Sequence, residues 1–401
     1  MITYIRKIRI FKLVFLLFRY YSNGTGKKFS SRRKILMEKI RLAVVGLGHR
    51  GRDMFKNISS TSGVEPVCAC DLDSALFYKS QRNTPALAET MEKVRFYDDF
   101  DKMMSDEKFD VLLVETPALC HAEFCVRALE RDIHVYSDIP SAATLEEADM
   151  LWQAQKRSRA LLMTGATTMG WGFVHAMQDI YQKGLLGKPY LLEAEYIHDC
   201  RSLWEESPWR KPSPGNAQNP AYYCTHGLGP LLSVMEEDLR YVNAFTTGSH
   251  MTDIPEANDA NIAVYRTESG VLVRQTNSFI NNCKTGTHSF RIFGTEGFFE
   301  HLAKRGDMPE TTAFSSNRMY GAKNYTKLPV SFQPHDSNGS FGHGGADSWL
   351  WHSFEKALRS KADKAPCDLR DGLRMTLPGI FAVRSILEGG REMKIRYPWD
   401  K

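Results

Sequence analysis

The stretch Gly46-Leu47-Gly48-His49-Arg50-Gly51 joins an apolar run, residues 42–45, to a segment with helical character, residues 52–60. Its three glycines have the spacing of a strand-to-helix turn that holds a dinucleotide. The first permits the tight turn, the second lets the backbone approach a pyrophosphate, and the third lets the helix pack against the strand. Backbone N–H groups at the helix start would face the phosphates. We therefore predict that these six residues bind a dinucleotide; an ordinary glycine-rich turn is the alternative.

An acidic residue at the end of the next apolar segment strengthens this prediction. Residues 64–70 are typical of a second strand, and Asp71 follows them directly. A carboxylate there can accept hydrogen bonds from ribose hydroxyls and would repel the 2′-phosphate of NADP. We predict NAD as the cofactor and regard NADP as the weaker alternative. Arg50 is the residue that could reverse this preference, because its side chain could reach a 2′-phosphate.

The two halves of the chain differ in their hydrophobic pattern. Up to residue 165, short apolar runs alternate with helical segments, which predicts an α/β fold with a doubly wound parallel sheet, the Rossmann arrangement. Beyond that point extended segments follow one another, which favours a C-terminal α+β domain with a mainly antiparallel sheet. We predict domains at 37–165 and 166–401, with the last helices packing back on the body. The polar stretch 303–342 is expected to be an irregular loop over a site.

Charge is concentrated at the N-terminus. The chain carries a net charge of +5, but residues 1–36 hold ten Lys and Arg and no acid, so the remainder carries −5. A mildly acidic body does not favour nucleic-acid binding. The apolar run 13–18 is too short to span a membrane. We predict that residues 1–36 are a disordered leader or that translation begins at Met37; a targeting segment for export is the alternative.

The cysteine pattern points to a reducing environment. None of the eight cysteines forms a CxxC pair, and no paired Cys/His spacing suggests a zinc site. We therefore predict a cytoplasmic protein without a bound metal.

Two further motifs follow predicted strands of the first domain. Thr116 and Pro117 come after the apolar segment 110–114, with His121 four residues past the proline, and Asp138 follows the segment 133–136. In a doubly wound sheet, ligands bind outside the carboxyl ends of the strands. We predict that Thr116, Pro117 and His121 line the dinucleotide crevice and that Asp138 lies near the nicotinamide. Strand-to-helix turns without ligand contact are the alternative.

These motifs, together with the Ser137-to-Pro140 segment, resemble the glucose-fructose oxidoreductase / inositol dehydrogenase / MocA-type oxidoreductases over about residues 38–397. The resemblance implies a Rossmann domain followed by a domain whose open sheet carries the substrate on one face. It also implies NAD(P)-dependent chemistry on a sugar or sugar derivative. In many members the other sheet face makes subunit contacts, so we expect a homo-oligomer.

The chain departs from the family pattern at one position that carries chemistry. The family commonly has Glu-Lys-Pro where this chain has Asp138-Ile139-Pro140, and the lysine assists proton transfer from the substrate hydroxyl. Ile139 can neither accept nor donate a proton. A family aspartate is likewise replaced by Tyr222, although the histidine of that pattern is kept as His226.

A sub-branch that also lacks the lysine looks more similar. The stretch Tyr223-to-Pro230 is similar to the Tyr-Pro-Thr-His-Gly-Leu-Gly-Pro segment of the NAD-dependent glycosidases of glycoside hydrolase family 109, and Tyr196-to-Asp199 also looks like theirs. The segment Thr168-to-Trp171 departs from that branch, which carries a tyrosine near there.

His226 is the strongest catalytic candidate, because an ordinary histidine exchanges protons near neutral pH. Tyr223 could donate a hydrogen bond to a sugar oxygen; a half-buried aromatic is the alternative. For substrate binding the candidates are His198, Asp199, Trp209 and Tyr222. The Gly342-to-Asp347 segment could close over a sugar, or Asp347 could be a plain acidic residue at a helix start.

Three functions remain open from the sequence. The first is an oxidoreductase that transfers a hydride at a ring carbinol of a sugar. The second is a redox-neutral glycosidase that works through a 3-keto intermediate, elimination and hydration, and needs no pair of carboxylates. The third is a non-catalytic NAD-binding protein, which the absent lysine favours and the retained His226 opposes.

Overall fold

The structure is a computed structural model that describes residues 39–82, 88–214, 219–283, 286–331, 333 and 342–400. The account below concerns the unit that begins at residue 39. The predicted leader at residues 1–36 lies outside the described residues. Among those that are described, no helix is both long and apolar enough to cross a membrane.

The first sheet has the predicted doubly wound parallel topology. Within the described residues it contains six parallel strands in the order β3-β2-β1-β4-β5-β6, so the strand order reverses between β1 and β4. Such a reversal opens a crevice at the carboxyl ends of the strands. The strands are β1 (Ile40–Val45), β2 (Val64–Cys70), β3 (Arg95–Tyr97), β4 (Val111–Val114), β5 (His134–Ser137) and β6 (Leu162–Thr164).

Helices cover both faces of this sheet, which explains the continuous apolar runs of β1 and β4. They are α2 (His49–Ser59), α3 (Ser74–Arg82), α4 (Ala88–Met91), α5 (Phe100–Asp106), α6 (His121–Leu129) and α7 (Leu145–Arg157). Thr144 begins α7 through a capping box, in which its side chain and that of Glu147 each accept a backbone N–H of the other.

The second sheet is mixed but mainly antiparallel, as predicted. Within the described residues its nine strands run in the order β14-β13-β12-β11-β7-β10-β9-β8-β15, and only β7 and β10 pair in parallel. They are β7 (Pro189–Ile197), β8 (Leu239–Thr246), β9 (Ala260–Thr267), β10 (Leu272–Ser278), β11 (Thr287–Gly294), β12 (Gly297–Leu302), β13 (Thr311–Ser316), β14 (Thr326–Leu328) and β15 (Met393–Lys394).

The prediction of an irregular loop at 303–342 was wrong. Two strands of the second sheet, β13 and β14, fall in this stretch. Sequence periodicity missed β13 because it consists largely of threonine, serine and alanine, and these small side chains are buried against β12 without an apolar alternation.

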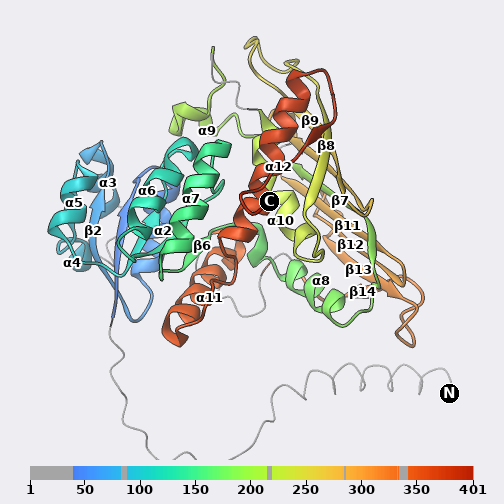
Figure 1. The fold of residues 1–401 in the computed structure, drawn as a ribbon, viewed down its shortest axis with the longest axis horizontal. Coiled ribbons are helices and arrows are strands. Elements are labelled where there is room, and N and C mark those ends of the chain that lie inside the picture. The colour runs from blue at the N-terminus through green and yellow to red at the C-terminus, as the bar shows by residue number, and fades with distance from the viewer. Residues whose placement is uncertain are drawn as a thin grey trace, which may run out of the picture. The chain divides into compact units, whose positions relative to one another are not determined.

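One face of the second sheet is covered by helices and the other is open (Figure 1). The covered face packs against α8 (Gly172–Gln182), α10 (Thr225–Leu232) and α12 (Leu369–Leu387). Of the late helices, α12 contacts β6 and α7 as well as β8, and α11 (Ala346–Ser360) contacts α2. Short elements complete the chain: α9 (Leu203–Glu206), η2 (Ala118–Cys120), η3 (Thr167–Gly170), η4 (Pro208–Arg210), η5 (Pro220–Tyr223) and η6 (His343–Gly345).

Candidate active site

The glycine-rich turn has the geometry that a dinucleotide requires. Gly46 has a φ of +91°, and an added Cβ would lie 2.6 Å from the backbone of Glu115. At Gly51 an added Cβ would lie 2.0 Å from the carbonyl oxygen of Gly46, so only glycine lets α2 start this close to β1. Gly48 is different, because nothing lies within 4 Å of an added Cβ and no side chain caps α2. This open space at the N-terminus of α2, which no side chain caps, fits a pyrophosphate.

Asp71 lies at the end of β2, where the adenosine ribose of a dinucleotide is expected. Its Oδ2 accepts the N–H of Leu47 at 2.6 Å, and its Oδ1 accepts the N–H of Asp73 at 2.9 Å. The carboxylate therefore also holds the glycine-rich turn in place. Each oxygen keeps a second lone pair that could accept a ribose hydroxyl.

The residues after β4 and β5 form the other side of the crevice. The hydroxyl of Thr116 is buried without a hydrogen-bond partner, as a side chain awaiting a ligand would be, and Pro117 is exposed beside it. His121 is buried, with Nδ1 2.9 Å from the carbonyl oxygen of Pro140 and Nε2 2.7 Å from that of Thr116. Both ring nitrogens of His121 are engaged by backbone carbonyl groups. His121 therefore connects the turn after β4 to the turn after β5 and helps to fix the shape of the crevice.

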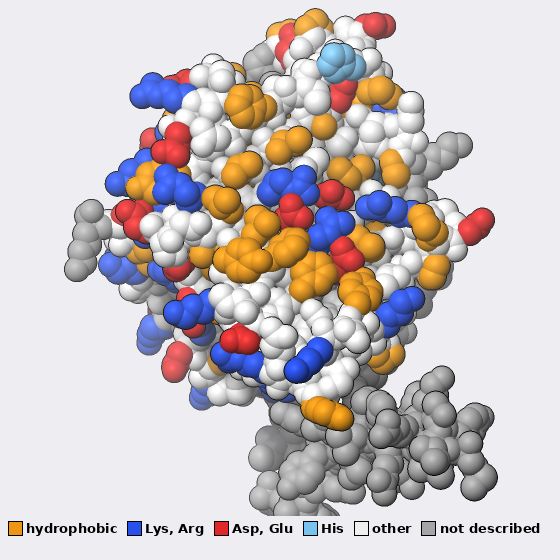
Figure 2. All heavy atoms as spheres, turned by 90° about the vertical axis from the view of Figure 1, so that its right-hand side faces the viewer, with side chains coloured by type: hydrophobic (Ala, Val, Ile, Leu, Met, Phe, Trp, Pro, Cys, Tyr) orange, Lys and Arg blue, Asp and Glu red, His pale blue; other side chains and the backbone are white. Residues whose placement is uncertain are grey.

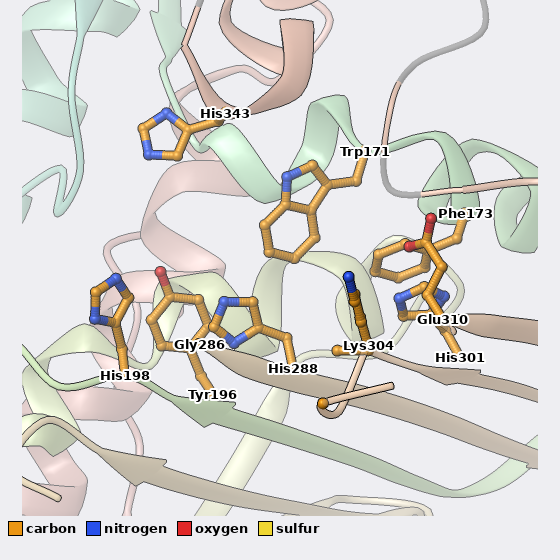
Figure 3. Close-up of a pocket in the computed structure, with 12 residues that line it drawn as sticks. Trp171, Phe173, Tyr196, His198, Gly286, His288, His301, Lys304, Glu310 and His343 are labelled. Atoms are coloured by element: carbon orange, nitrogen blue, oxygen red, sulfur yellow. The ribbon is translucent and has the colours of Figure 1, made fainter. Parts of the chain in front are cut away.

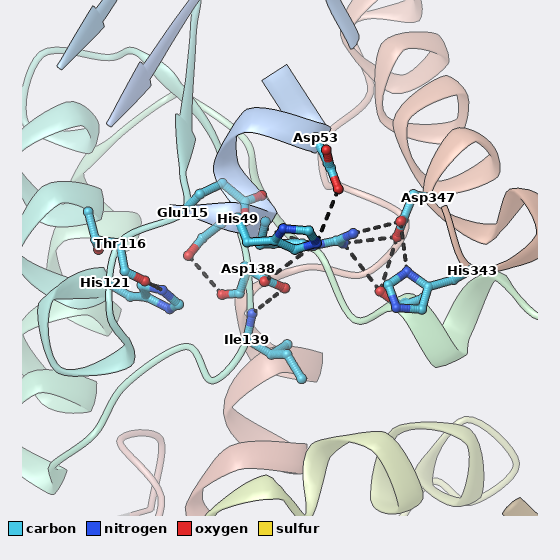
Figure 4. A network of polar contacts seen from close by, with 12 residues as sticks. His49, Asp53, Glu115, Thr116, His121, Asp138, Ile139, His343 and Asp347 are labelled. Carbon is cyan, nitrogen blue, oxygen red and sulfur yellow. Dashed lines mark hydrogen bonds and ion pairs between the residues drawn. The ribbon is translucent and has the colours of Figure 1, made fainter. Parts of the chain in front are cut away.

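A network of carboxylates surrounds Arg50 (Figure 4). Arg50 donates to both oxygens of Asp347, at 2.6 and 2.9 Å, and its Nε lies 3.5 Å from Asp138 and 3.9 Å from Glu115. Thr167 also donates to Asp347, at 3.1 Å. The network ties the glycine-rich turn to the start of α11. The same contacts engage the guanidinium of Arg50, the group that could otherwise bind the 2′-phosphate of NADP.

A cavity of about 630 Å³ lies on the covered face of the second sheet. His343 and His198 stand at one end, and Lys304 and Glu310 at the other (Figure 3). Its remaining lining is aromatic, imidazole or small: Trp171, Phe173, Tyr196, His288, His301, Gly286, Ala303 and Gly306. Aromatic faces combined with a few polar groups suit a sugar ring.

The cavity floor belongs to a column of stacked rings. Tyr196 and His288 are directly opposite each other on β7 and β11, and their rings stack at 4.2 Å. His226 stacks on the other side of Tyr196 at 4.5 Å, followed by Tyr223 at 6.4 Å from His226. His226 does not itself line this cavity. Trp171 extends the column at 5.5 Å from His288.

His226 is held in its neutral form by its surroundings. Burial, and then the nearby His288, His343 and Arg50, lower the pKa of His226 well below the ordinary value. Its Nδ1 is buried without a hydrogen-bond partner in the described structure. Burial likewise lowers the pKa of His288 to about 4. Burial raises the pKa of Tyr223, so this residue keeps its hydroxyl proton.

His343 connects the cavity to the Arg50 network. Its Nδ1 lies 2.9 Å from Oδ2 of Asp347, and its side chain is half exposed at the cavity end. Burial opposes ionisation of Asp347, but the charge and hydrogen bonds of Arg50 hold the pKa of Asp347 below its ordinary value. An ionised carboxylate on Nδ1 fixes an imidazole so that Nε2 can exchange a proton with a ligand.

Of the substrate-binding candidates, only His198 lines the cavity. Asp199 instead forms an ion pair with Arg201 at 2.7 Å. Trp209 stacks against Arg210 at 4.3 Å, and Arg210 also donates to the hydroxyl of Tyr223. Tyr222 is 40% exposed and does not line the cavity.

Sequence reasoning missed most of the cavity wall. Trp171 was noted only as a departure from the glycosidase branch, and neither His288 nor His301 was proposed as a site residue. One signal was available in the sequence: the neighbouring strands β11 and β12 each carry a histidine, His288 and His301, on the covered face of the sheet. The Gly342-to-Asp347 segment was identified, but its ion pair with Arg50 could not be read from residues 297 positions apart.

Comparison with known proteins agrees with this geometry. A family model described as "Oxidoreductase family, NAD-binding Rossmann fold" matches residues 40–166, and the GFO/IDH/MocA C-terminal domain matches residues 174–300. A glycosyl hydrolase family 109 protein of Shewanella pealeana is 23% identical, covering 90% of this chain and 85% of the relative. An alpha-N-acetylgalactosaminidase of Bacteroides fragilis is 28% identical, covering 49% of this chain and 48% of that protein.

Solved structures share the fold. Levoglucosan dehydrogenase in complex with NADH superposes with a TM-score of 0.73 at 17% identity, covering 90% of this chain and 100% of that one. GenD2 from gentamicin A biosynthesis in complex with NAD gives a TM-score of 0.70 at 16% identity, covering 93% and 100%. The two family models together span well over half of the chain, with the glycine-rich turn inside the first and His226 inside the second, so the chain belongs to the GFO/IDH/MocA family of NAD-binding oxidoreductases.

Proposed function

We propose that this protein oxidises a ring hydroxyl of a sugar or sugar derivative with NAD. The observation that carries the proposal is the position of His343, which lines the aromatic cavity and contacts Asp347, the partner of Arg50 in the glycine-rich turn. A ligand in the cavity therefore lies next to the end of the dinucleotide crevice. When bound, NAD supplies the hydride acceptor; the protein's residues orient the sugar and move its proton.

Two histidines are candidates for the hydroxyl proton: His343, which lines the cavity, and His226, which lies outside its lining and stacks on the cavity residue Tyr196. His226 is neutral for the reasons given above and could accept a proton through its ring nitrogens. His343 is supported by an ionised carboxylate and faces the cavity. We propose His226 as the principal acceptor, with Tyr223 as its ring neighbour and His343 as the residue that relays the proton to solvent. Ile139 cannot perform this role, because its buried side chain has no ionisable group.

A redox-neutral glycosidase is the second candidate. The replacement of the family's lysine by Ile139 favours it, as do the names of the sequence relatives. In this reaction a ring hydroxyl is oxidised to a ketone, which acidifies the neighbouring C–H. A base removes that proton as the C1 substituent leaves. Water then adds at C1, and the ketone is reduced back, so no NADH accumulates.

A defined experiment separates these functions. The nucleotide bound to the purified protein is identified by mass spectrometry, and free sugars and nitrophenyl glycosides are then tested for NADH formation and nitrophenol release. NADH formation from a free sugar supports the oxidoreductase. Nitrophenol release without net NADH supports the glycosidase. Bound NAD with neither product on a wide panel would contradict both and leave a non-catalytic NAD-binding protein.

We also propose that the open face of the second sheet binds a second copy of the chain. Apolar side chains on this face are exposed, among them Phe245 at 60% and Ile262 at 48% (Figure 2). The charged residues between them are already paired within the sheet, as Arg274 with Glu193 at 2.8 Å and Arg291 with Glu300 at 2.6 Å. A face of apolar groups and paired ions can be buried without leaving an isolated charge.

The free cysteines are consistent with a cytoplasmic location, which we propose as well.

A further inference from the structure

We propose that Asp138 and Asp347 make this protein bind oxidised NAD in preference to NADH. The inference rests on the proposed function for the identity of the cofactor and goes beyond it in assigning a preferred oxidation state. It follows from the number of charges around Arg50 and from where the nicotinamide ring must lie.

The position of the nicotinamide follows from the fold. Asp71 at the end of β2 marks the adenosine side of the crevice, and the strand order reverses between β1 and β4. A dinucleotide that crosses this point carries its nicotinamide half to the ends of β4 and β5, where Asp138 lies. The ring must also reach the cavity, because a hydride passes only between groups in contact. The Arg50 network, whose carboxylates Figure 4 labels, connects the glycine-rich turn to this cavity. We therefore place the ring beside this network.

The charges of the network do not balance. Arg50 is shared by Asp347 and Asp138, and its guanidinium is the only permanent positive charge among the described residues of the network. Two carboxylates and one guanidinium leave an excess of one negative charge. Ile139 supplies no compensating cation at the position where the family commonly has a lysine. His343 adds a positive charge only when it is protonated.

Glu115 is a third carboxyl group, but it does not add to this excess. Its side chain is completely buried and lies within hydrogen-bond reach of the carboxylate of Asp138. Burial, followed by the charge of Asp138, raises the pKa of Glu115 well above its ordinary value. Burial thus favours the uncharged form of Glu115, and Glu115 serves as the comparison residue for Asp138.

The two forms of the cofactor differ in charge at one group. The nicotinamide ring of NAD+ is cationic and that of NADH is neutral, whereas the ribose and phosphate groups are the same. An excess negative charge beside the ring thus stabilises bound NAD+ relative to bound NADH, by Coulomb attraction in a partly desolvated site. A protein with this preference releases the NADH formed by sugar oxidation in exchange for NAD+ and so begins the next turnover with the oxidised cofactor.

The test measures which form the protein retains. The purified full-length protein is equilibrated by dialysis against equimolar NAD+ and NADH at pH 8, where an ordinary histidine is neutral. Bound nucleotides are released and quantified by chromatography. We expect at least a fewfold excess of bound NAD+ for the wild type. Asp138→Asn keeps an acceptor for the N–H of Ile139 but removes the charge, and it should shift the bound ratio about tenfold toward NADH.

Two control variants make the result specific. Glu115→Gln should leave the ratio within about twofold, because burial already disfavours the charged form of this side chain. Asp53→Asn removes an exposed carboxylate on α2 that pairs with His49, and it should also leave the ratio unchanged. An excess of bound NADH on the wild type would overturn the proposal, whatever the variants do. So would an unchanged ratio in Asp138→Asn, or an equal shift in Asp53→Asn. Failure to bind either nucleotide would instead contradict the proposed function.

Discussion

At the scale of single residues, Asp71 should decide between the two nicotinamide cofactors. Its carboxylate occupies the end of β2, and the nearby Arg50 is held by Asp347 and is not available to a 2′-phosphate. We expect the wild type to bind NAD at least tenfold more tightly than NADP. Asp71→Asn keeps an acceptor for the N–H of Leu47 but removes the negative charge. This variant should therefore reduce the ratio of NAD affinity to NADP affinity. Titration of both cofactors checks it, and equal affinities in the wild type would contradict the assignment.

The role of His226 should be visible in both rate and pH dependence. His226→Ala should keep NAD affinity, because the dinucleotide binds mainly to the first sheet, and lose on the order of 10²-fold in kcat. The pKa of His226 lies below its ordinary value of about 6.5, so its neutral form persists as the pH falls below that value. The wild-type rate should therefore hold at pH 6 and decline only in more acidic solution.

A matched control for this measurement is His250→Ala. His250 lies on an exposed segment, where its Nε2 contacts the carbonyl oxygen of Thr247, and it is absent from the cavity wall. This variant should retain the wild-type rate and pH profile. A His226→Ala rate within about threefold of the wild type would transfer the proton-accepting role to His343 or Tyr223.

At the scale of elements, the turn between β1 and α2 offers a paired test of folding against binding. Gly51→Ala would place a Cβ 2.0 Å from the carbonyl oxygen of Gly46, so α2 must move and the melting temperature should fall by several degrees. Gly48→Ala meets nothing within 4 Å and should fold normally. It should nevertheless weaken NAD binding, because the methyl group enters the space assigned to the pyrophosphate. Thermal melts and NAD titrations of both variants check this, and normal NAD affinity in Gly48→Ala would place the pyrophosphate elsewhere.

Local patterns predicted the elements that carry a strong periodic signal. The strand, turn and helix around Gly46 and the capping box at Thr144 are encoded in adjacent residues, and the structure contains both. Strand β13 was missed because most of its side chains are small or polar, although the strand is paired with β12 on one side and β14 on the other. Propensity alone cannot detect a strand that is stabilised by its neighbour.

At the scale of the whole molecule, the site depends on contacts that no local pattern reveals. Arg50 was predicted to face the cofactor, yet it is bound by Asp347 from the far end of the chain. Tyr196 was matched to the glycosidase branch, but its position between His226 and His288 follows from sheet register. The cofactor residues were more predictable than the substrate residues, because the former cluster in short motifs and the latter come together only through the second sheet.

The open face of that sheet provides the test of assembly. Ile262 and Phe245 are opposite each other on β9 and β8, and both are exposed, so burying them against a second copy removes apolar surface from water. Light scattering on the wild type should give a mass of at least two chains. Ile262→Arg should shift it toward one chain without lowering the melting temperature of the subunit itself, because the side chain makes no core contact. Met150→Arg changes an exposed apolar residue on α7 and should leave the mass unchanged. A wild type with the mass of a single chain at micromolar concentration would show that this face is not a subunit interface.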